Sequence, residues 1–195
     1  MTNLRLFSPL TALLLLTSAF SAKAEDLQAP SSFLEFGRNA DRWEARAGGA
    51  IYDFGPFTPQ SFSGGVINGE LLAPSPKFLH GIGAPRPYIG TDIAISDDPI
   101  HVFYAGLNWE AYVSRKVYFG FSAGGAALSR RAETNDEGEE KDLGSQVLFH
   151  LQASAGVDLT ENLTAQVYFN HFSNAQLGES NDGLESIGVR LGFRF

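Results

Sequence analysis

The chain has 195 residues and a formal net charge of −8, from 14 lysines and arginines against 22 aspartates and glutamates. This acidic balance argues against a nucleic-acid binder, which needs a basic face. The sequence contains no cysteine, which excludes thiolate metal sites, cysteine nucleophiles and disulfides. Glycine, at 21 residues, and phenylalanine, at 16, are both abundant, as is typical of a β-rich chain.

The N-terminal segment has the features of a secretory signal peptide. Arg5 gives a positive start, an apolar stretch covers residues 10–20, and Ala22-Lys23-Ala24 is a small-x-small cleavage signal. The alternative is an uncleaved helical anchor, but the apolar stretch is too short to span a membrane. We therefore expect residues 1–24 to be removed and residues 25–195 to form a single domain.

Apolar and polar residues then alternate in segments separated by turn signals, a pattern that predicts β-strands. The last segment shows the alternation most clearly. Its odd positions from Ile187 to Phe195 are apolar, and its even positions are serine, glycine or arginine. Eight such segments are predicted, at 43–54, 64–74, 86–96, 101–113, 117–130, 143–160, 163–174 and 185–195.

Three features favour a transmembrane barrel over the alternative, a soluble β-sandwich with solvated polar faces. The segments run to about 10–14 residues, which is enough to cross a bilayer at a tilt. Phe195 ends the chain on the apolar face and resembles the terminal signal that the outer-membrane assembly machinery reads. The opposite faces carry charges of both signs, as in a filled barrel interior. These are Glu44, Arg46, Glu70, Asp92, Glu110, Arg190 and Arg194.

We therefore predict an all-β, eight-stranded antiparallel transmembrane β-barrel in the bacterial outer membrane, with a filled polar interior and no open pore. By the usual convention for such barrels, both termini and the short turns are periplasmic, and the longer loops face outside. The long connection 73–85 is a periplasmic exception. The acidic stretch 135–142 is interpreted as a solvated outer loop, with a divalent-ion site as the alternative. An aromatic girdle is expected at the periplasmic strand ends, from Trp43, Trp109, Phe119, Phe193 and Phe195.

Three polar residues interrupt the apolar faces of the last two segments. His171 and Ser173 lie on the apolar face of their segment, and Glu185 shares the face of Ile187. Residues at i and i+2 project side by side from a strand, and Glu185 can approach from the neighbouring strand. Serine, histidine and a carboxylate are the nucleophile, base and orienting acid of serine esterases. The alternative is that the three simply lie at the membrane interface, where polar groups cost little.

The segment HFSNAQLGESNDGLESIGVRLGFRF (171–195) resembles the C-terminal signature of the PagL-type lipid A 3-O-deacylases, the outer-membrane acyloxyacyl hydrolases. The segments PRPYIGTDIA (85–94) and YAGLNWE (104–110) also look like middle strands of that family. The resemblance implies an outer-membrane barrel that hydrolyses the 3-position ester-linked hydroxyacyl chain of lipid A. The implied substrate is lipopolysaccharide in the outer leaflet, whose acyl chains can reach a lipid-facing site.

The same resemblance implies roles for individual residues. Ser173 would be the nucleophile, His171 the base and Glu185 the third member of a triad. Asn174 and Asn181 would lie near the oxyanion or support the loop. The family often has glycine where this chain has Gln176, so the oxyanion donors are not assigned.

No cofactor or metal is expected, because the four histidines form no ligand pattern; they are His80, His101, His150 and His171. Three other functions stay open. The chain could be a non-enzymatic structural or adhesin-like barrel, another lipid-modifying enzyme such as a phospholipase or acyltransferase, or a soluble ligand-binding barrel. The sequence also leaves open homodimerisation, the preferred acyl-chain length and latency in the native membrane.

Overall fold

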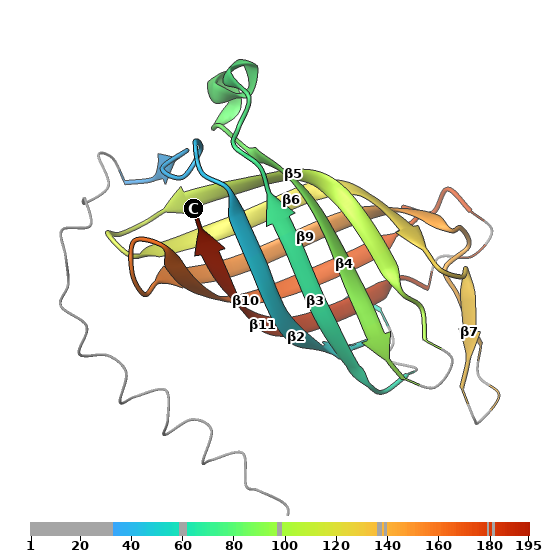
Figure 1. The fold of residues 1–195 in the computed structure, drawn as a ribbon. Coiled ribbons are helices and arrows are strands. Elements are labelled where there is room, and N and C mark those ends of the chain that lie inside the picture. The colour runs from blue at the N-terminus through green and yellow to red at the C-terminus, as the bar shows by residue number, and fades with distance from the viewer. Residues whose placement is uncertain are drawn as a thin grey trace, which may run out of the picture.

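The computed structural model describes residues 33–58, 62–96, 99–135, 138, 140–178, 180 and 182–195. Eight long antiparallel strands pair in chain order, and the pairing of the last with the first closes them into a barrel (Figure 1). The strands are β2 (Glu44–Tyr52), β3 (Gly65–Leu72), β4 (Arg86–Ile95), β5 (Val102–Tyr112), β6 (Val117–Leu128), β9 (Val147–Asp158), β10 (Leu163–Ser173) and β11 (Leu184–Arg194). The predicted fold is confirmed. The predicted signal peptide, residues 1–24, lies outside the described residues.

Seven of the eight predicted segments contain one of these strands, and β11 begins one residue before its predicted segment, 185–195. The strand within the segment 143–160 is shorter than expected. Strand β9 begins only at Val147. Gly144 adopts a left-handed φ of 72°, which interrupts the extended backbone before the strand begins. Leu143 is fully buried and joins the apolar core at this end of the barrel instead of the outer wall.

The two ends of the barrel differ, and we name them the turn end and the loop end. The turn end carries the tight turns after β5 and β9, the C-terminus, the two-residue strand β1 (Glu35–Phe36), and a 3₁₀ helix, η1 (Lys77–Ile82). The loop end carries the hairpin of β7 (Ala132–Thr134) and β8 (Glu140–Asp142), shown at the far right of Figure 1. By the convention for such barrels, the turn end would be periplasmic.

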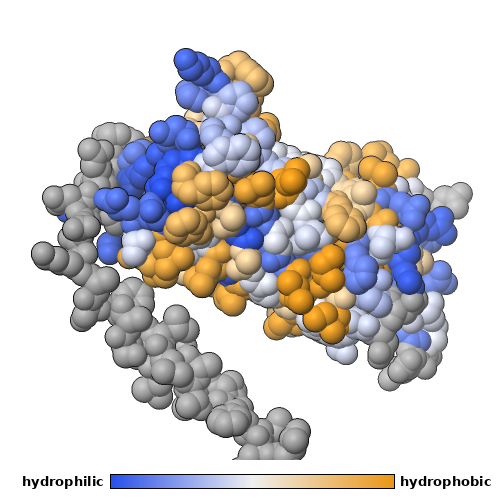
Figure 2. Space-filling view, viewed as in Figure 1, coloured by the Kyte–Doolittle hydropathy of each residue, from blue (hydrophilic) through white to orange (hydrophobic). Residues whose placement is uncertain are grey.

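The outer wall of the barrel is apolar, as the alternation predicts. Apolar side chains from all eight strands are exposed on it, including Ile67, Ile89, Phe103 and Val167. Figure 2 shows hydrophobic residues along the face of the barrel wall that is in view. Four of the five expected girdle aromatics are exposed at the turn end, and the fifth, Trp109, is half-buried. Among the described residues, no helix is long and apolar enough to cross a membrane.

Polar side chains fill the barrel interior towards the turn end. Arg46 contacts three carboxylates, with 2.6 Å to Glu44, 3.3 Å to Glu70 and 2.5 Å to Glu110. Arg86 bridges Glu44 and Glu110, each at 2.8 Å. All of these groups are buried, so the charges compensate one another in a region of low dielectric. The predicted filled polar interior is therefore present.

We predict that Arg46→Met lowers the free energy of unfolding by about 3–5 kcal/mol, because it leaves three buried carboxylates with fewer compensating charges. The matched control is Arg42→Met. Arg42 lies at the rim, where it bonds Asn162 and two backbone carbonyls, and its loss should cost less than about 1 kcal/mol. Urea unfolding of both variants in lipid vesicles provides the comparison, and equal stability of the two would contradict the prediction.

Candidate active site

The barrel register brings the three predicted triad residues together at the loop end. His171 on β10 lies directly opposite Glu185 on β11. Ser173 is the last residue of β10, two positions further along the same face. The backbone ladder therefore fixes the relative positions of the three α-carbons, because a slip of one residue would turn His171 into the barrel interior.

Two hydrogen bonds connect the three side chains through the imidazole ring. His171 Nδ1 lies 2.8 Å from Glu185 Oε1, and Nε2 lies 3.0 Å from Ser173 Oγ. With the proton on Nδ1, the ring donates to the carboxylate and its Nε2 accepts from the serine hydroxyl. This is the geometry that lets a histidine remove the serine proton while a carboxylate holds the ring in position.

Glu185 does not face lipid as the alternation suggested, because its side chain is 0% exposed. A segment after β2, residues 53–58, lies over it. The backbone N–H groups of Phe57 and Thr58 donate to Glu185 Oε2 at 3.0 and 3.2 Å. Both carboxylate oxygens are therefore hydrogen-bonded, one to the histidine and one to this segment, which we call the acid clamp. The clamp relieves the cost of placing a carboxylate on the apolar face.

The clamp reaches the triad through close contacts at two of its residues. At Gly55, an added Cβ would lie 2.2 Å from Glu185 Oε2 and 2.7 Å from Glu185 Cβ, so only glycine fits. The exposed Phe57 ring meets the His171 ring edge-on, with centroids 5.9 Å apart, and also packs on Phe169. Phe57 therefore packs the clamp directly against the imidazole ring.

The hairpin β7–β8 anchors the acid clamp from the loop end. Lys141 on β8 pairs with Asp53, the first residue of the clamp, and both are buried. Asp53 also accepts a hydrogen bond from the Phe62 backbone at 3.1 Å. The acidic stretch 135–142 was expected to be a solvated outer loop, but its Lys141 is buried, as is Glu133, the strand partner of Lys141 on β7.

Glu133 is a titratable member of this anchor and lies outside the eight spanning strands. Burial raises the pKa of Glu133 to about 7, and the nearby Asp53 adds to the rise. The hydrogen bond donated by Tyr52 Oη, 2.9 Å from Glu133 Oε2, and the cations Lys141 and Arg130 oppose it. The docked hairpin therefore favours the protonated form of Glu133.

The turn after β10 contains Asn174 and Gln176, two further residues that the sequence analysis singled out. The buried Asn174 amide donates to the backbone carbonyls of Leu143 and Ser180, at 3.1 and 2.6 Å, and so holds two loops together. Gln176 adopts a left-handed φ of 62°, a conformation that glycine takes without strain. A glutamine can therefore occupy this position, but its left-handed backbone conformation is less favourable than it would be for glycine. Asn181 lies outside the described residues.

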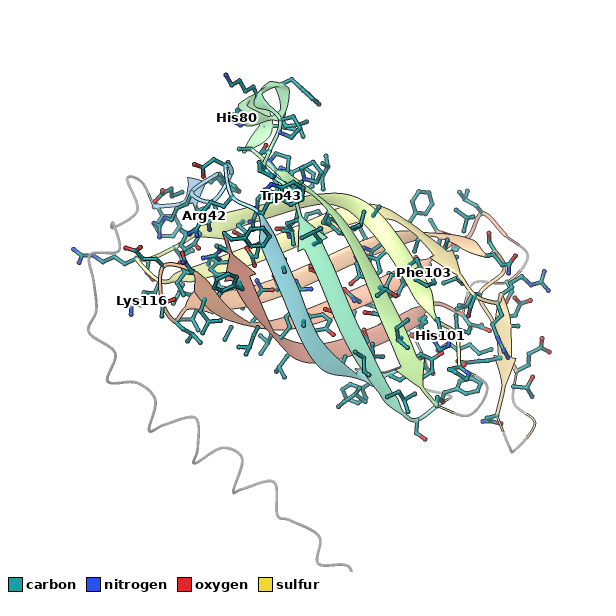
Figure 3. The ribbon with its side chains drawn as sticks, viewed as in Figure 1. Arg42, Trp43, His80, His101, Phe103 and Lys116 are labelled. Atoms are coloured by element: carbon teal, nitrogen blue, oxygen red, sulfur yellow. The ribbon has the colours of Figure 1, made fainter. Side chains whose placement is uncertain are left out.

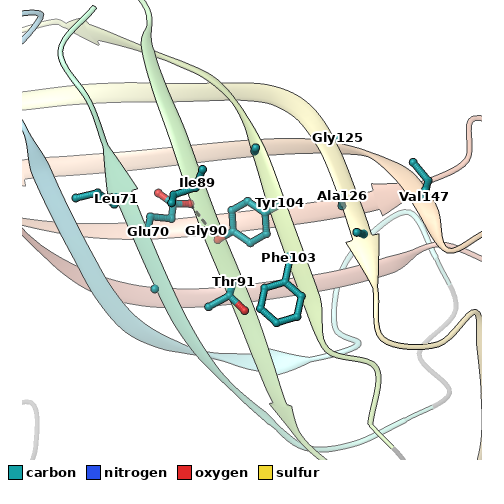
Figure 4. Close-up of a pocket in the computed structure, with 13 residues that line it drawn as sticks. Glu70, Leu71, Ile89, Gly90, Thr91, Phe103, Tyr104, Gly125, Ala126 and Val147 are labelled. Carbon is teal, nitrogen blue, oxygen red and sulfur yellow. Dashed lines mark hydrogen bonds between the residues drawn. The ribbon is translucent and has the colours of Figure 1, made fainter.

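Two apolar grooves on the outer wall differ in their relation to the triad. One, of about 710 Å³, lies over β3 to β6 between Leu71, Ile89, Phe103 and Val147, and the triad is not part of it (Figure 4). The other, of about 700 Å³, is lined by Phe149, Asn174 and Leu177 among others. Phe149 is the strand partner of Ser173, so this second groove adjoins the serine. No three histidine, aspartate or glutamate side chains of the described chain could together hold a metal ion.

We predict that Gly55→Ala slows covalent labelling of Ser173 by a serine-directed fluorophosphonate by about tenfold or more, because the added methyl group displaces Glu185. The matched control is Gly69→Ala on β3, where an added Cβ meets no atom within 4 Å. Labelling rates of the purified barrels are measured by mass spectrometry, with Ser173→Ala as the blank. Equal rates for both glycine variants would show that the clamp does not position the acid.

We predict that the hairpin β7–β8 becomes less protected from hydrogen exchange as the pH rises from about 4.5, the ordinary pKa of a glutamate, to about 7, and that its protection changes little above that pH. A group whose folded-state pKa is raised stabilises the folded form below its unfolded pKa and loses that contribution as it ionises. Glu133→Gln should flatten this dependence, whereas Glu140→Gln, at an exposed carboxylate on β8, should leave it unchanged. Exchange rates corrected for intrinsic chemistry test this. An unchanged slope in Glu133→Gln would contradict the prediction.

Comparisons with known proteins agree with this fold. Residues 100–194 match the family described as lipid A 3-O-deacylase (PagL). The crystal structure of the outer-membrane enzyme PagL is 17% identical, with a TM-score of 0.53 over 77% of this chain and 98% of that one. The N-terminal β-barrel domain of Pseudomonas aeruginosa OprF is 13% identical, with a TM-score of 0.54 over 86% and 100%. No curated protein sequence matches the chain.

The family match covers all strands from β5 to β11, so it includes both strands that carry the proposed triad. The solved structures are too different in sequence to show more than the fold. Together, the match over residues 100–194 and the closed barrel confirm the resemblance read from the C-terminal strands: this chain has the fold of an outer-membrane β-barrel and is similar to the lipid A 3-O-deacylase (PagL) family.

Proposed function

We propose that this barrel hydrolyses the 3-position ester-linked hydroxyacyl chain of lipid A, with Ser173, His171 and Glu185 as its catalytic triad. The observation that carries the proposal is the pair of hydrogen bonds through His171, at 2.8 Å to the carboxylate and 3.0 Å to the serine. Polar residues that only lie at the membrane interface would not need this alignment. They would also not need a buried carboxylate that is held by two backbone N–H groups.

Acylation of the enzyme is the first half of the proposed reaction. Ser173 Oγ attacks the ester carbonyl carbon as its proton passes to His171 Nε2. The carbon becomes tetrahedral and the carbonyl oxygen becomes an oxyanion. This intermediate collapses, the bond from the carbon to the sugar oxygen breaks, and His171 gives the proton to that oxygen. Glu185 keeps the ring oriented and stabilises the imidazolium throughout.

Water completes the reaction. It attacks the acyl-serine carbonyl as His171 removes its proton, and collapse of the second tetrahedral intermediate releases a 3-hydroxy fatty acid. His171 then returns the proton to Ser173 Oγ, which restores the enzyme. All proton transfers pass through one nitrogen, Nε2, the atom that faces Ser173.

The location of the triad suits a substrate that stays in the membrane. His171 and Ser173 are partly exposed on the outer wall, and the groove beside Ser173 has Phe149 and Leu177 among its lining residues. With the loop end outside, as the convention has it, the triad lies at the level of the outer leaflet, where lipopolysaccharide resides. An acyl chain can then reach the serine without entering the packed interior.

The test is mass spectrometry of lipid A incubated with purified barrel in detergent. The wild type should remove one hydroxyacyl chain and release the free 3-hydroxy acid, and Ser173→Ala should lower the rate by at least about 10³-fold. Ser63→Ala, at an exposed serine of the loop end, is the matched control and should keep full activity. Detergent extraction also removes any latency imposed by the native membrane.

Other products would overturn the proposal in distinct ways. A lysophospholipid from added phosphatidylethanolamine, with lipid A intact, would indicate a phospholipase. Transfer of the acyl group to an acceptor would indicate an acyltransferase. Unchanged lipids with a barrel shown to be folded by its gel mobility before heating would favour the structural or adhesin-like alternative.

A further inference from the structure

The connection between β3 and β4 forms a projection that the proposed function does not use. Its helix η1 extends sideways from the turn end of the barrel (Figure 1). Phe78 is 83% exposed and Ile82 is 59% exposed, although both are large apolar residues. The same projection carries hydrophilic residues, and Figure 2 shows both kinds on its surface. An apolar area of this kind matters where it is continuous with a larger apolar surface.

A hydrogen bond fixes the depth of this projection along the barrel wall. Trp109 Nε1 donates to the Ile82 carbonyl oxygen at 2.9 Å. Trp109 lies three residues inside the turn end of β5, or about 10 Å along the strand. The girdle residue Phe119 pairs with Ala111, nearer to the end of the same strand. Ile82 therefore lies beside the lipid-facing wall, and along the barrel axis it is no closer to the turn end than the aromatic girdle.

Packing at the helix end holds the projection in this position. Gly83 ends η1 with a left-handed φ of 94°, and its α-carbon faces Trp109 and Phe36, both of which are apolar neighbours at this rim. The Trp109 ring in turn lies 6.3 Å from the ring of Phe121 on the wall. The apolar surface of the projection is thus continuous with the lipid-facing wall.

Charge near the projection suits a headgroup layer. Lys77 begins η1 and is exposed next to Phe78. The turn end also carries Arg42 and Lys116, which lie with His80 at this end of the molecule in Figure 3. A lysine beside an aromatic side chain can keep its ammonium group at the headgroups while the ring enters the acyl region.

We propose that η1 is an interfacial anchor, which inserts Phe78 and Ile82 among the phospholipids of the membrane leaflet at the turn end of the barrel. The partner is the lipid surface itself: acyl chains for the two apolar residues and phosphate groups for Lys77. Because Ile82 is bonded to the wall at girdle depth, anything projecting sideways from it enters the interface between headgroups and chains. The anchor does not depend on the proposed hydrolase activity.

The absence of cysteine in the sequence makes the test direct, because a single introduced cysteine can be labelled without other changes. A nitroxide is attached to Phe78→Cys in the full barrel, reconstituted in vesicles of phosphatidylethanolamine and phosphatidylglycerol. Collision with apolar oxygen and with a water-soluble nickel chelate is then compared by electron paramagnetic resonance. We expect the ratio of oxygen to nickel collisions at Phe78 to be several-fold higher than at the exposed turn residue Glu161.

Two labelled controls bracket the result. Phe121→Cys on the lipid-facing wall defines the value for membrane, and Glu161→Cys in the turn after β9 defines the value for water at the same end. Ile82→Cys replaces Phe78→Cys if the latter does not migrate as a folded barrel before heating. A ratio at the anchor equal to that at Glu161 would overturn the proposal, and one approaching that at Phe121 would support it.

Discussion

Every backbone N–H and C=O of a membrane-spanning strand must find a partner within the protein, because the bilayer core offers none. Closing the sheet by pairing β11 with β2 meets this requirement for all eight strands. The register that closure imposes is also what places His171 opposite Glu185. The geometry of the proposed triad is therefore a consequence of the same hydrogen-bond ladder that makes the barrel stable in lipid.

That ladder positions the histidine and serine, but it does not make the acid acceptable on an apolar face. The carboxylate of Glu185 needs partners for both oxygens, and the strands supply only His171. The second oxygen is satisfied by backbone amides of the acid clamp, which the β7–β8 hairpin anchors through Asp53 and Lys141. The site thus combines a rigid wall with a loop assembly, and the loop assembly contributes the part that is hardest to desolvate.

The sequence predicts those parts of this arrangement that follow from the alternation of apolar and polar residues along each strand. Alternation located all eight strands, and it found His171, Ser173 and Glu185 because they break an otherwise apolar face. It could not find the clamp, because Asp53 and Lys141 are 88 residues apart and belong to loops, whose contacts no periodicity encodes. Gly55-Pro56 indicates a turn, but nothing local shows that the turn covers a carboxylate. For the same reason Glu185 was expected to face lipid and is instead buried.

In the barrel interior, too, the alternation predicts which residues point inward but not which residues they contact. Alternation predicts that Arg46 points inward, yet its three carboxylate partners come from β2, β3 and β5 and depend on how the strands stagger around the ring. Among the described residues, these compensated charges fill the interior towards the turn end. The proposed hydrolysis of an acyl chain is therefore placed on the outer wall, where His171 and Ser173 are partly exposed. The polar residues that break the apolar pattern there are consequently the most informative positions in the sequence.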